Sequence, residues 1–401
     1  MGFFSFDRYK INNGVCLVRF ERPGELTLLR VQEIMEKPKV KKCNRIVVII
    51  GPKVTAIGDY AFQKSHFSSI IIPKSVKSIE PKSFSSSKCY MFFFEHTSKP
   101  REWRFQFDES PTKHNTLWGI NGYGITDNII WVQKNNSITI CGYVGTQQNL
   151  TVPEQINGCP VETIGDYAFL GCSSLKSITL PDCVKTVGRW GFGKCVQLES
   201  VTLPNGITHI GDSAFAHCSS ITSVTLPEGL TTIEPFTFQN CEGLESISIP
   251  ESITNIGFYA FCCCSMLTEI TIPYGVKQIE HGAFQECSSL ATIRLPYSIT
   301  SISENLFWSC TSLSKVTIPE SVTSIGKYAF YGCKSLKKIL IPKQITSMGE
   351  DVFSDCEELE IRCVAESKPE GWHGKWNYGF YYQDYEVKWG CPPPAKKTIN
   401  E

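Results

Sequence analysis

The sequence predicts a β-rich repeat solenoid, a fold in which short coils of chain stack on one another with their strands parallel. Three observations predict it. Proline recurs every 23 residues, at positions 181, 204, 227, 250, 273, 296, 319 and 342. Phenylalanine follows each of these prolines by eleven residues, from Phe192 to Phe353, and cysteine follows each phenylalanine by three. An aliphatic residue comes three places after each cysteine, and a fixed period of this kind is the signature of a stacked array.

Each part of the repeat has its own expected structure. The ending L-x-x-I-x-I-P alternates apolar and polar residues and is β-branched, so we expect a short strand that the proline closes. V-T-x-I-G should be a second extended piece, and Y-A-F-x-x-C a short helical turn. One unit cannot bury its own apolar side chains, so the Phe, Cys and Leu positions are predicted to form continuous buried columns.

Three of the units carry a family resemblance. GDYAFLGCSSLKSITLP, GDSAFAHCSSITSVTLP and GKYAFYGCKSLKKILIP resemble BspA-like leucine-rich repeats. The resemblance implies a right-handed leucine-rich-repeat solenoid with parallel strands, which has no shared active site and binds proteins. Members are mostly bacterial and protozoan surface proteins that attach to host or matrix proteins and to other cells. A protein ligand of that kind, and a cell-surface or secreted location, are therefore what the resemblance implies for this chain.

Seven segments are expected along the chain. Residues 45–97 carry a shortened form of the unit and form a short repeat block, and residues 161–364 form the main array. The same tryptophan-containing cap is expected after each block, at 98–125 and 365–391, because Ser98-Lys99-Pro100-x-x-Trp103 recurs as Ser367-Lys368-Pro369-x-x-Trp372. Residues 126–160 predict a β-hairpin with a turn at Asn135-Asn136. Residues 1–44 are expected to be a cap or small β-rich module, and residues 392–401 a loose tail.

Composition and motifs argue against several classes of function. Lys plus Arg equals Asp plus Glu at 39 each, so no overall field draws the chain to nucleic acid. No apolar stretch reaches the ~18 residues of a membrane span, and MGFFSFDRYKINNGV does not read as a secretory leader. An intracellular structural or interaction module is therefore the alternative to a surface protein. We find no zinc-ligand spacing, nucleophile elbow or phosphate loop, and expect no enzyme, cofactor or metal.

The 19 cysteines are explained mainly by the repeat. Nine of them, from Cys172 to Cys356, are in phase, and we interpret these as buried structural thiols because free cysteine is among the most buried residue types. Cys262 and Cys263 stand beside the in-phase Cys264 but are themselves out of phase. Whether these two thiols are reactive is left open by the sequence.

The outward positions of the predicted strands give the candidate partner-binding residues. Their charges change from acidic at Glu245 and Glu269 to basic at Arg294, Lys315 and Lys338. This face is interpreted either as a solvated sheet face or as a polar docking surface. Tyr274 and Tyr297 share one phase in adjacent coils and are expected to stack, and Trp308 completes the candidate set because exposed Tyr and Trp often anchor interfaces. The ligand, the face that binds it and the oligomeric state do not follow from the sequence.

Overall fold

The structure is a computed structural model that describes residues 7–12, 15–43, 45–103, 115–379 and 384–393. It contains two compact units, Met1–Val196 and Gln197–Glu401. The seven segments expected from the sequence were defined by the repeat pattern, whereas these two units are defined by compactness. The expected segment boundaries therefore stay predictions. The first and last segments of the chain that those boundaries define lie partly or largely outside the described residues.

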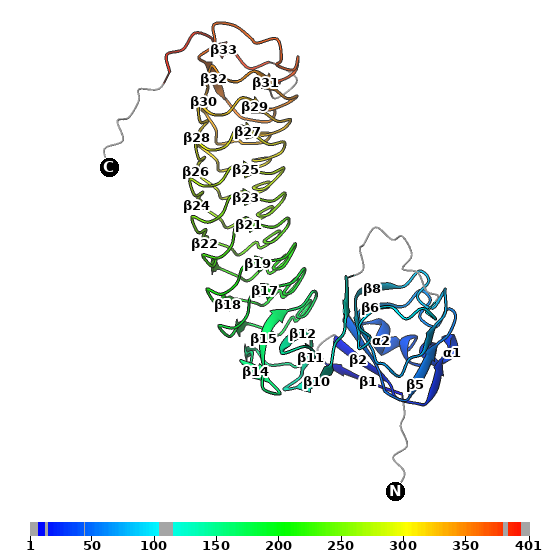
Figure 1. The fold of residues 1–401 in the computed structure, drawn as a ribbon. Coiled ribbons are helices and arrows are strands. Elements are labelled where there is room, and N and C mark those ends of the chain that lie inside the picture. The colour runs from blue at the N-terminus through cyan, green and yellow to red at the C-terminus, as the bar shows by residue number, and fades with distance from the viewer. Residues whose placement is uncertain (1–6, 13–14, 44, 104–114, 380–383, 394–401) are drawn as a thin grey trace. The chain divides into compact units, whose positions relative to one another are not determined.

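The first unit opens with a six-stranded sheet in which every neighbouring pair is parallel except the first. Its spatial order is β1 (Arg8–Asn12), β2 (Val15–Phe20), β4 (Arg45–Ile50), β6 (His66–Ile72), β8 (Lys88–Phe94) and β9 (Asn115–Trp118). A second sheet consists of β3 (Gly24–Leu26), β5 (Val54–Ile57) and β7 (Ser78–Ile79). Figure 1 shows both sheets with the two helices of this block.

The pairing shows that residues 15–43 are the first coil of this block. β2 pairs with β4 and β3 pairs with β5, both in parallel, as successive coils do later in the chain. Where later coils have turns, this coil has the helices α1 (Leu28–Met35) and α2 (Pro38–Lys41). The Thr27 hydroxyl caps α1 by accepting from the Arg30 N–H, and a proline opens α2, so both helices start with favoured residues.

A β-hairpin lies between the first block and the main array. β10 (Gly122–Thr126) pairs with β11 (Ile129–Lys134), and β11 pairs with β12 (Ser137–Tyr143) across the Asn135-Asn136 turn. Asn135 has a φ of 54°, which asparagine tolerates better than most residues. β12 then pairs in parallel with β15 (Cys159–Ile164), which pairs antiparallel with β14 (Gln155–Ile156) and in parallel with β17 (Thr186–Val187). β13 (Asn149–Thr151) pairs in parallel with β16 (Ser177–Thr179).

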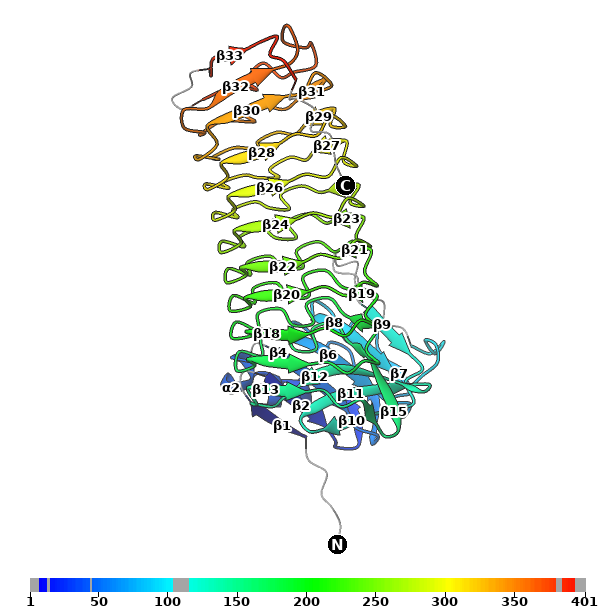
Figure 2. The ribbon, with the colours of Figure 1, turned by 90° about the vertical axis from the view of Figure 1, so that its left-hand side faces the viewer.

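The second unit repeats a coil with two short strands, and these stack into two columns (Figure 1, Figure 2). The first column contains β18 (Ser200–Thr202), β20 (Ser223–Thr225), β22 (Ser246–Ser248), β24 (Glu269–Thr271), β26 (Thr292–Arg294), β28 (Lys315–Thr317), β30 (Lys338–Ile341), β32 (Glu360–Cys363) and β33 (Val387–Lys388). The second contains β19 (His209–Ile210), β21 (Thr232–Ile233), β23 (Asn255–Ile256), β25 (Gln278–Ile279), β27 (Ser301–Ile302), β29 (Ser324–Ile325) and β31 (Ser347–Met348). Within each column, the neighbouring strands that pair with each other are parallel and in register.

The third side of each coil is a series of tight turns, where the sequence had suggested a short helical turn. In one coil Tyr259 and Cys263 have φ values of 54° and 61°, and left-handed residues recur at both positions in every described coil of the array. The backbone N–H groups of Tyr259, Phe261 and Cys263 donate to carbonyls of the next coil, at 3.0, 2.9 and 2.8 Å. An α-helix needs each N–H for its own i−4 carbonyl, so this bonding between coils excludes it.

The predicted columns of phenylalanine and cysteine are present and buried. From Phe215 to Phe353 the rings of successive coils stack with centroids 5.4 to 6.0 Å apart. Seven of the in-phase thiols, Cys195 and those from Cys241 to Cys356, donate to the phenylalanine carbonyl 26 residues earlier, as Cys264 does to Phe238 at 3.3 Å. At the end of the array Trp376 packs edge-on against Phe353, with the ring centroids 6.3 Å apart.

The two caps are anchored alike. The indole of Trp103 donates to the Lys77 carbonyl at 3.1 Å, and the indole of Trp372 donates to the Ile345 carbonyl at 3.0 Å. Both tryptophans are buried. Each cap contains one more parallel strand, β9 after the first block and β33 after the second. The sequence duplication therefore corresponds to a repeated structural ending.

The first unit has a second core outside its coils. The outward side chains of its first sheet, among them Val47, Ile49 and Phe93, are buried against the hairpin residues Ile130 and Val132. The strand face of this block is therefore covered by another part of the same chain.

A buried arginine ties the first block to the start of the array within the first unit. Arg45 is 2% exposed and donates to the carbonyls of Ala168 and Cys141, the latter at 2.6 Å. Tyr90 stacks on Tyr167 with the ring centroids 4.2 Å apart. Because Arg45 lies in β4 and its carbonyl partners lie beyond residue 140, these bonds hold the two segments together.

Candidate functional site

The strand face of the second unit consists of the outward side chains along β22 to β30. Five of its charged members are the predicted residues Glu245, Glu269, Arg294, Lys315 and Lys338, and all five are exposed. The sixth, Lys337, precedes β30 as Glu245 precedes β22. Glu269 lies in register with Thr292, which lies in register with Lys315, so the acidic and basic side chains occupy nearby rungs. Parallel strands are about 4.8 Å apart, so the five charges span about 20 Å along the column.

These five charges have no ion-pair partner among the described residues. Their neighbour Lys337, by contrast, pairs with Glu358 at 3.6 Å. The change from acidic to basic residues also extends beyond the strand face. Residues 228–304 contain nine glutamates and only Lys277 and Arg294 as basic residues, whereas residues 305–343 contain six lysines and one glutamate. The strand face therefore presents unpaired charge in an acidic part followed by a basic part.

Tyr274 and Tyr297 lie at the corner of the coil, just after the prolines that end two strands of the face. They are 63% and 61% exposed. The expected stacking between them is not found among the ring contacts of the described residues. Both side chains are therefore accessible at the edge of the strand face and do not form a stacked pair.

Trp308 lies on the turn side of the coil, away from the strand face. Its ring stacks on Tyr331 with centroids 6.0 Å apart, and Tyr331 in turn meets Tyr328 edge-on. The structure therefore brings seven of the eight candidate residues to the strand face or its corner and leaves Trp308 outside that group.

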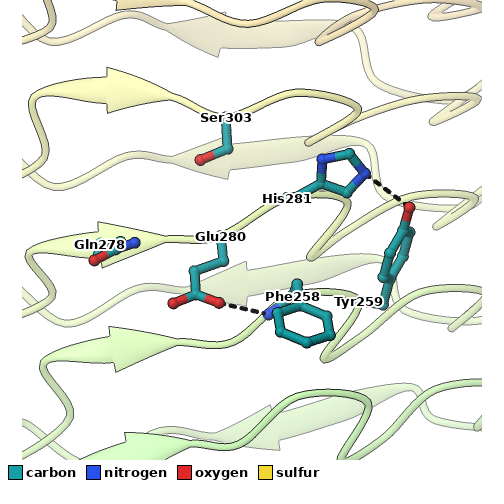
Figure 3. A pocket seen from close by; sticks show the side chains of 6 residues that line it. All are labelled: Phe258, Tyr259, Gln278, Glu280, His281 and Ser303. Atoms are coloured by element: carbon teal, nitrogen blue, oxygen red, sulfur yellow. Dashed lines mark hydrogen bonds between the residues drawn. The ribbon is translucent and has the colours of Figure 1, made fainter. Parts of the chain in front are cut away.

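A hollow of about 450 Å³, lined by aromatic and polar side chains, lies at the turn of the second unit that contains Phe258 and Tyr259, and the sequence did not reveal it (Figure 3). In it the Tyr259 hydroxyl and the His281 Nε2 atom are 2.7 Å apart, and the Glu280 carboxylate accepts from the Phe258 N–H at 3.2 Å. Burial raises the pKa of the Tyr259 hydroxyl. The signal in the sequence that could have indicated the hollow is Tyr259, an aromatic residue outside the Phe, Cys and Leu positions of the repeat. Its partner His281 belongs to the next coil, so the sequence did not connect the two residues.

The serine of the hollow, Ser303, is not paired with His281. Ser303 donates its hydroxyl proton to the Ile279 carbonyl at 2.5 Å, so this hydroxyl is not paired with His281. Glu304 is 4.0 Å from the His281 Nδ1 atom and is largely exposed. Nucleophilic catalysis needs a hydroxyl within hydrogen-bond reach of its base. Ser303 does not meet this condition, and the hydroxyl that lies beside His281 is that of Tyr259, whose pKa burial raises.

In the described part of the chain, no group of three or more His, Cys, Asp or Glu residues is arranged to hold a metal ion. Neither described helix is long and apolar enough to cross a bilayer.

Comparison with known proteins identifies the repeat. A family model described as the BspA type leucine rich repeat region matches six copies, over residues 33–108, 146–268 and 254–365. The chain belongs to this family. Its first match starts inside α1, in the coil that the repeat pattern alone had not revealed. No curated protein matches the BspA-type chain.

Three solved structures resemble this BspA-type protein. A leucine-rich repeat protein of T. pallidum is 31% identical, covers 54% of this chain and 87% of its own, and has a TM-score of 0.39. A leucine-rich repeat protein from Bacteroides ovatus is 21% identical over 93% of this chain and 90% of its own, with a TM-score of 0.42. The pneumococcal vaccine antigen PcpA is 18% identical over 96% and 86%, with a TM-score of 0.41.

Proposed function

We propose that this BspA-type repeat scaffold binds a protein partner along the strand face of its second unit. The observation that carries the proposal is the set of five exposed charges, at Glu245, Glu269, Arg294, Lys315 and Lys338, which have no ion-pair partner among the described residues. Such charges steer a partner toward a surface and fix its register more than they add affinity. Tyr274 and Tyr297 at the corner offer the large, amphipathic side chains from which binding energy usually comes.

The charge pattern defines the chemistry of the partner. Its basic side chains would face Glu245 and Glu269, and its acidic side chains would face Arg294, Lys315 and Lys338. A partner with this arrangement is guided into one orientation along the column, because the opposite orientation would place like charges together.

The strand face of the first unit supports the proposal, because another segment of polypeptide packs on it. There the outward side chains of the strands are covered by a β-hairpin of the same chain. The first unit's covered face is apolar at Val47, Ile49 and Phe93, whereas the second unit's face is polar and charged. An apolar face suits a permanent intramolecular contact, and a polar one suits a partner that binds and leaves.

The proposal is tested by photo-crosslinking from two positions of one coil. A photoreactive phenylalanine analogue is introduced at Thr317, on β28, or at Thr323, just before β29; both residues are exposed. The full chain is then incubated with cells or matrix material and illuminated. We expect a discrete adduct from Thr317 and none from Thr323, and the adduct should disappear in Lys315→Glu/Lys338→Glu. Equal adducts from both positions, or adducts that ignore the charge reversal, would contradict the proposal.

For the setting of this binding we propose attachment at a cell surface, which the family resemblance suggests. Protein interaction inside the cell is the second candidate, and the 19 free cysteines favour it because thiols persist in reducing compartments. Protease treatment of intact cells distinguishes the two. Surface attachment predicts that the protein is cleaved, and a protein left whole on intact cells but cleaved after lysis would support the intracellular role.

A further inference from the structure

Cys262 and Cys263 are arranged differently from the cysteines of the core. The in-phase Cys264 and Cys287 are fully buried and donate to phenylalanine carbonyls. Cys262 and Cys263 instead have their sulfur atoms 3.5 Å apart and in contact with each other. In an extended strand neighbouring side chains point to opposite faces, but here the turn, with a φ of 61° at Cys263, leaves both sulfurs together.

The two thiols differ in access. Cys263 is partly exposed and lines an open hollow of about 500 Å³ on the turn side, together with Glu242, Glu286 and several hydroxyl residues. Cys262 is only 4% exposed. A reagent in the hollow can therefore reach the Cys263 sulfur, and the buried Cys262 sulfur lies 3.5 Å from it.

The contact also distinguishes the two thiols chemically. A hydrogen bond from Cys262 lowers the pKa of Cys263, against burial and the nearby Glu286 carboxylate, which raise it. The same hydrogen bond and burial raise the pKa of Cys262. The accessible sulfur is thus the one that more readily becomes the nucleophilic thiolate.

We propose that Cys263 is a site of thiol–disulfide exchange with small-molecule disulfides and that Cys262 resolves the product. The Cys263 thiolate attacks one sulfur of the small disulfide, which forms a mixed disulfide and releases one small thiolate. The Cys262 thiol then loses its proton and attacks the Cys263 sulfur, which releases the second small thiolate. The two protein thiols are oxidised to one disulfide, and the small disulfide is reduced to two thiols that take up the two protons.

Geometry makes the product easy to reverse. The two sulfur atoms must approach from 3.5 Å to the ~2.05 Å of a disulfide bond. Adjacent residues have Cα atoms about 3.8 Å apart, below the ~4.4 Å at which ordinary disulfides begin, so the ring that forms is strained and readily reduced. Cys263 is therefore a reversible modification site.

The test uses the full reduced chain with oxidised glutathione as the small disulfide, under anaerobic conditions. Free thiols are then alkylated, and cleavage after glutamate releases residues 252–269, which contain only Cys262, Cys263 and Cys264. We expect this peptide to lose two hydrogens and to carry one alkyl group, and mild reduction should restore three alkylated cysteines. A peptide that carries glutathione in the wild-type chain, or one that is fully alkylated, would overturn the proposal.

Cys183 provides the control in the same sample. It is partly exposed, and its thiol donates to backbone carbonyls of Glu154 and Val161 at 3.4 and 3.3 Å. A thiol without a resolving neighbour should retain glutathione, so Cys183 is expected to hold a mixed disulfide while residues 252–269 do not. In Cys262→Ser, glutathione should remain on Cys263; a Cys262→Ser chain that remains unmodified while Cys183 reacts would likewise overturn the proposal.

Discussion

Phe261→Ala tests the stacked column on which the solenoid depends. Phe261 is fully buried, and its ring stacks on Phe238 and Phe284 with centroids 5.6 and 5.5 Å apart. Removing a buried phenylalanine costs about 3–5 kcal/mol, and the loss of two stacked neighbours places this site in the upper part of that range. A loss of about 4 kcal/mol corresponds to roughly a thousandfold faster exchange of amides that open with this coil.

The assay is native-state hydrogen exchange, because local protection is defined even where a repeat array does not unfold in one step. The matched control is Tyr274→Ala in a neighbouring coil, where the aromatic ring is 63% exposed and the expected change is about 0.5 kcal/mol or less. Two results would refute the stacking argument. In one, the amides around Phe261 lose protection equally in both variants; in the other, they keep their protection in Phe261→Ala.

Three further predictions concern other parts of the chain. Arg45→Met should destabilise the first unit by about 2–4 kcal/mol, because two buried carbonyls lose their donor; unchanged exchange of the hairpin amides would contradict this. Burial alone raises the pKa of Asp7, but hydrogen bonds from Arg30 and Arg22 lower it to about 2. The folded-state pKa of Asp7 is below the unfolded one, so about 1–2 kcal/mol of stability should be present above pH 4 and lost as the pH falls toward 2. If hydrogen exchange in β2 is equally acid-sensitive in Asp7→Asn, this prediction is wrong. Tyr274→Ala/Tyr297→Ala should weaken the crosslinked partner about tenfold or more in a titration, and wild-type affinity would remove the pair as an anchor.

The positions in phase with the repeat could be predicted because each core position is occupied by one residue type. Phe261 and Cys264 recur every 23 residues, so their burial follows from stacking alone. The left-handed turn positions are different. Tyr259 and Cys263 stand where other coils have residues as different as tryptophan, lysine, glutamate and glycine, so no single residue type marks the backbone geometry. For that reason the sequence suggested a helical turn where the coil has tight turns bonded to its neighbour.

Two features depend on distant parts of the chain and could not be predicted locally. The first coil has α1 in place of the usual turn, and only its parallel pairing with the next coil reveals it. The role of Arg45 could not be predicted either. The sequence RIVVII is typical of an ordinary strand, and the carbonyl groups that Arg45 binds are 96 and 123 residues away. At the candidate surface, the phase placed the strand charges correctly on an exposed face. The phase did not predict the position of Trp308, whose ring stacks on Tyr331 on the turn side of the coil.

The affinity of the crosslinked partner for a charge-reversed strand face tests the central claim most directly. Lys315→Glu/Lys338→Glu is compared with wild type and with Lys277→Glu, an exposed lysine in the acidic part of the unit that lies beside β25 and not on the strand face. If the partner binds along the strand face, the double variant should weaken the dissociation constant by about tenfold or more, and Lys277→Glu should leave it nearly unchanged. Equal affinity of all three proteins would contradict binding at this face.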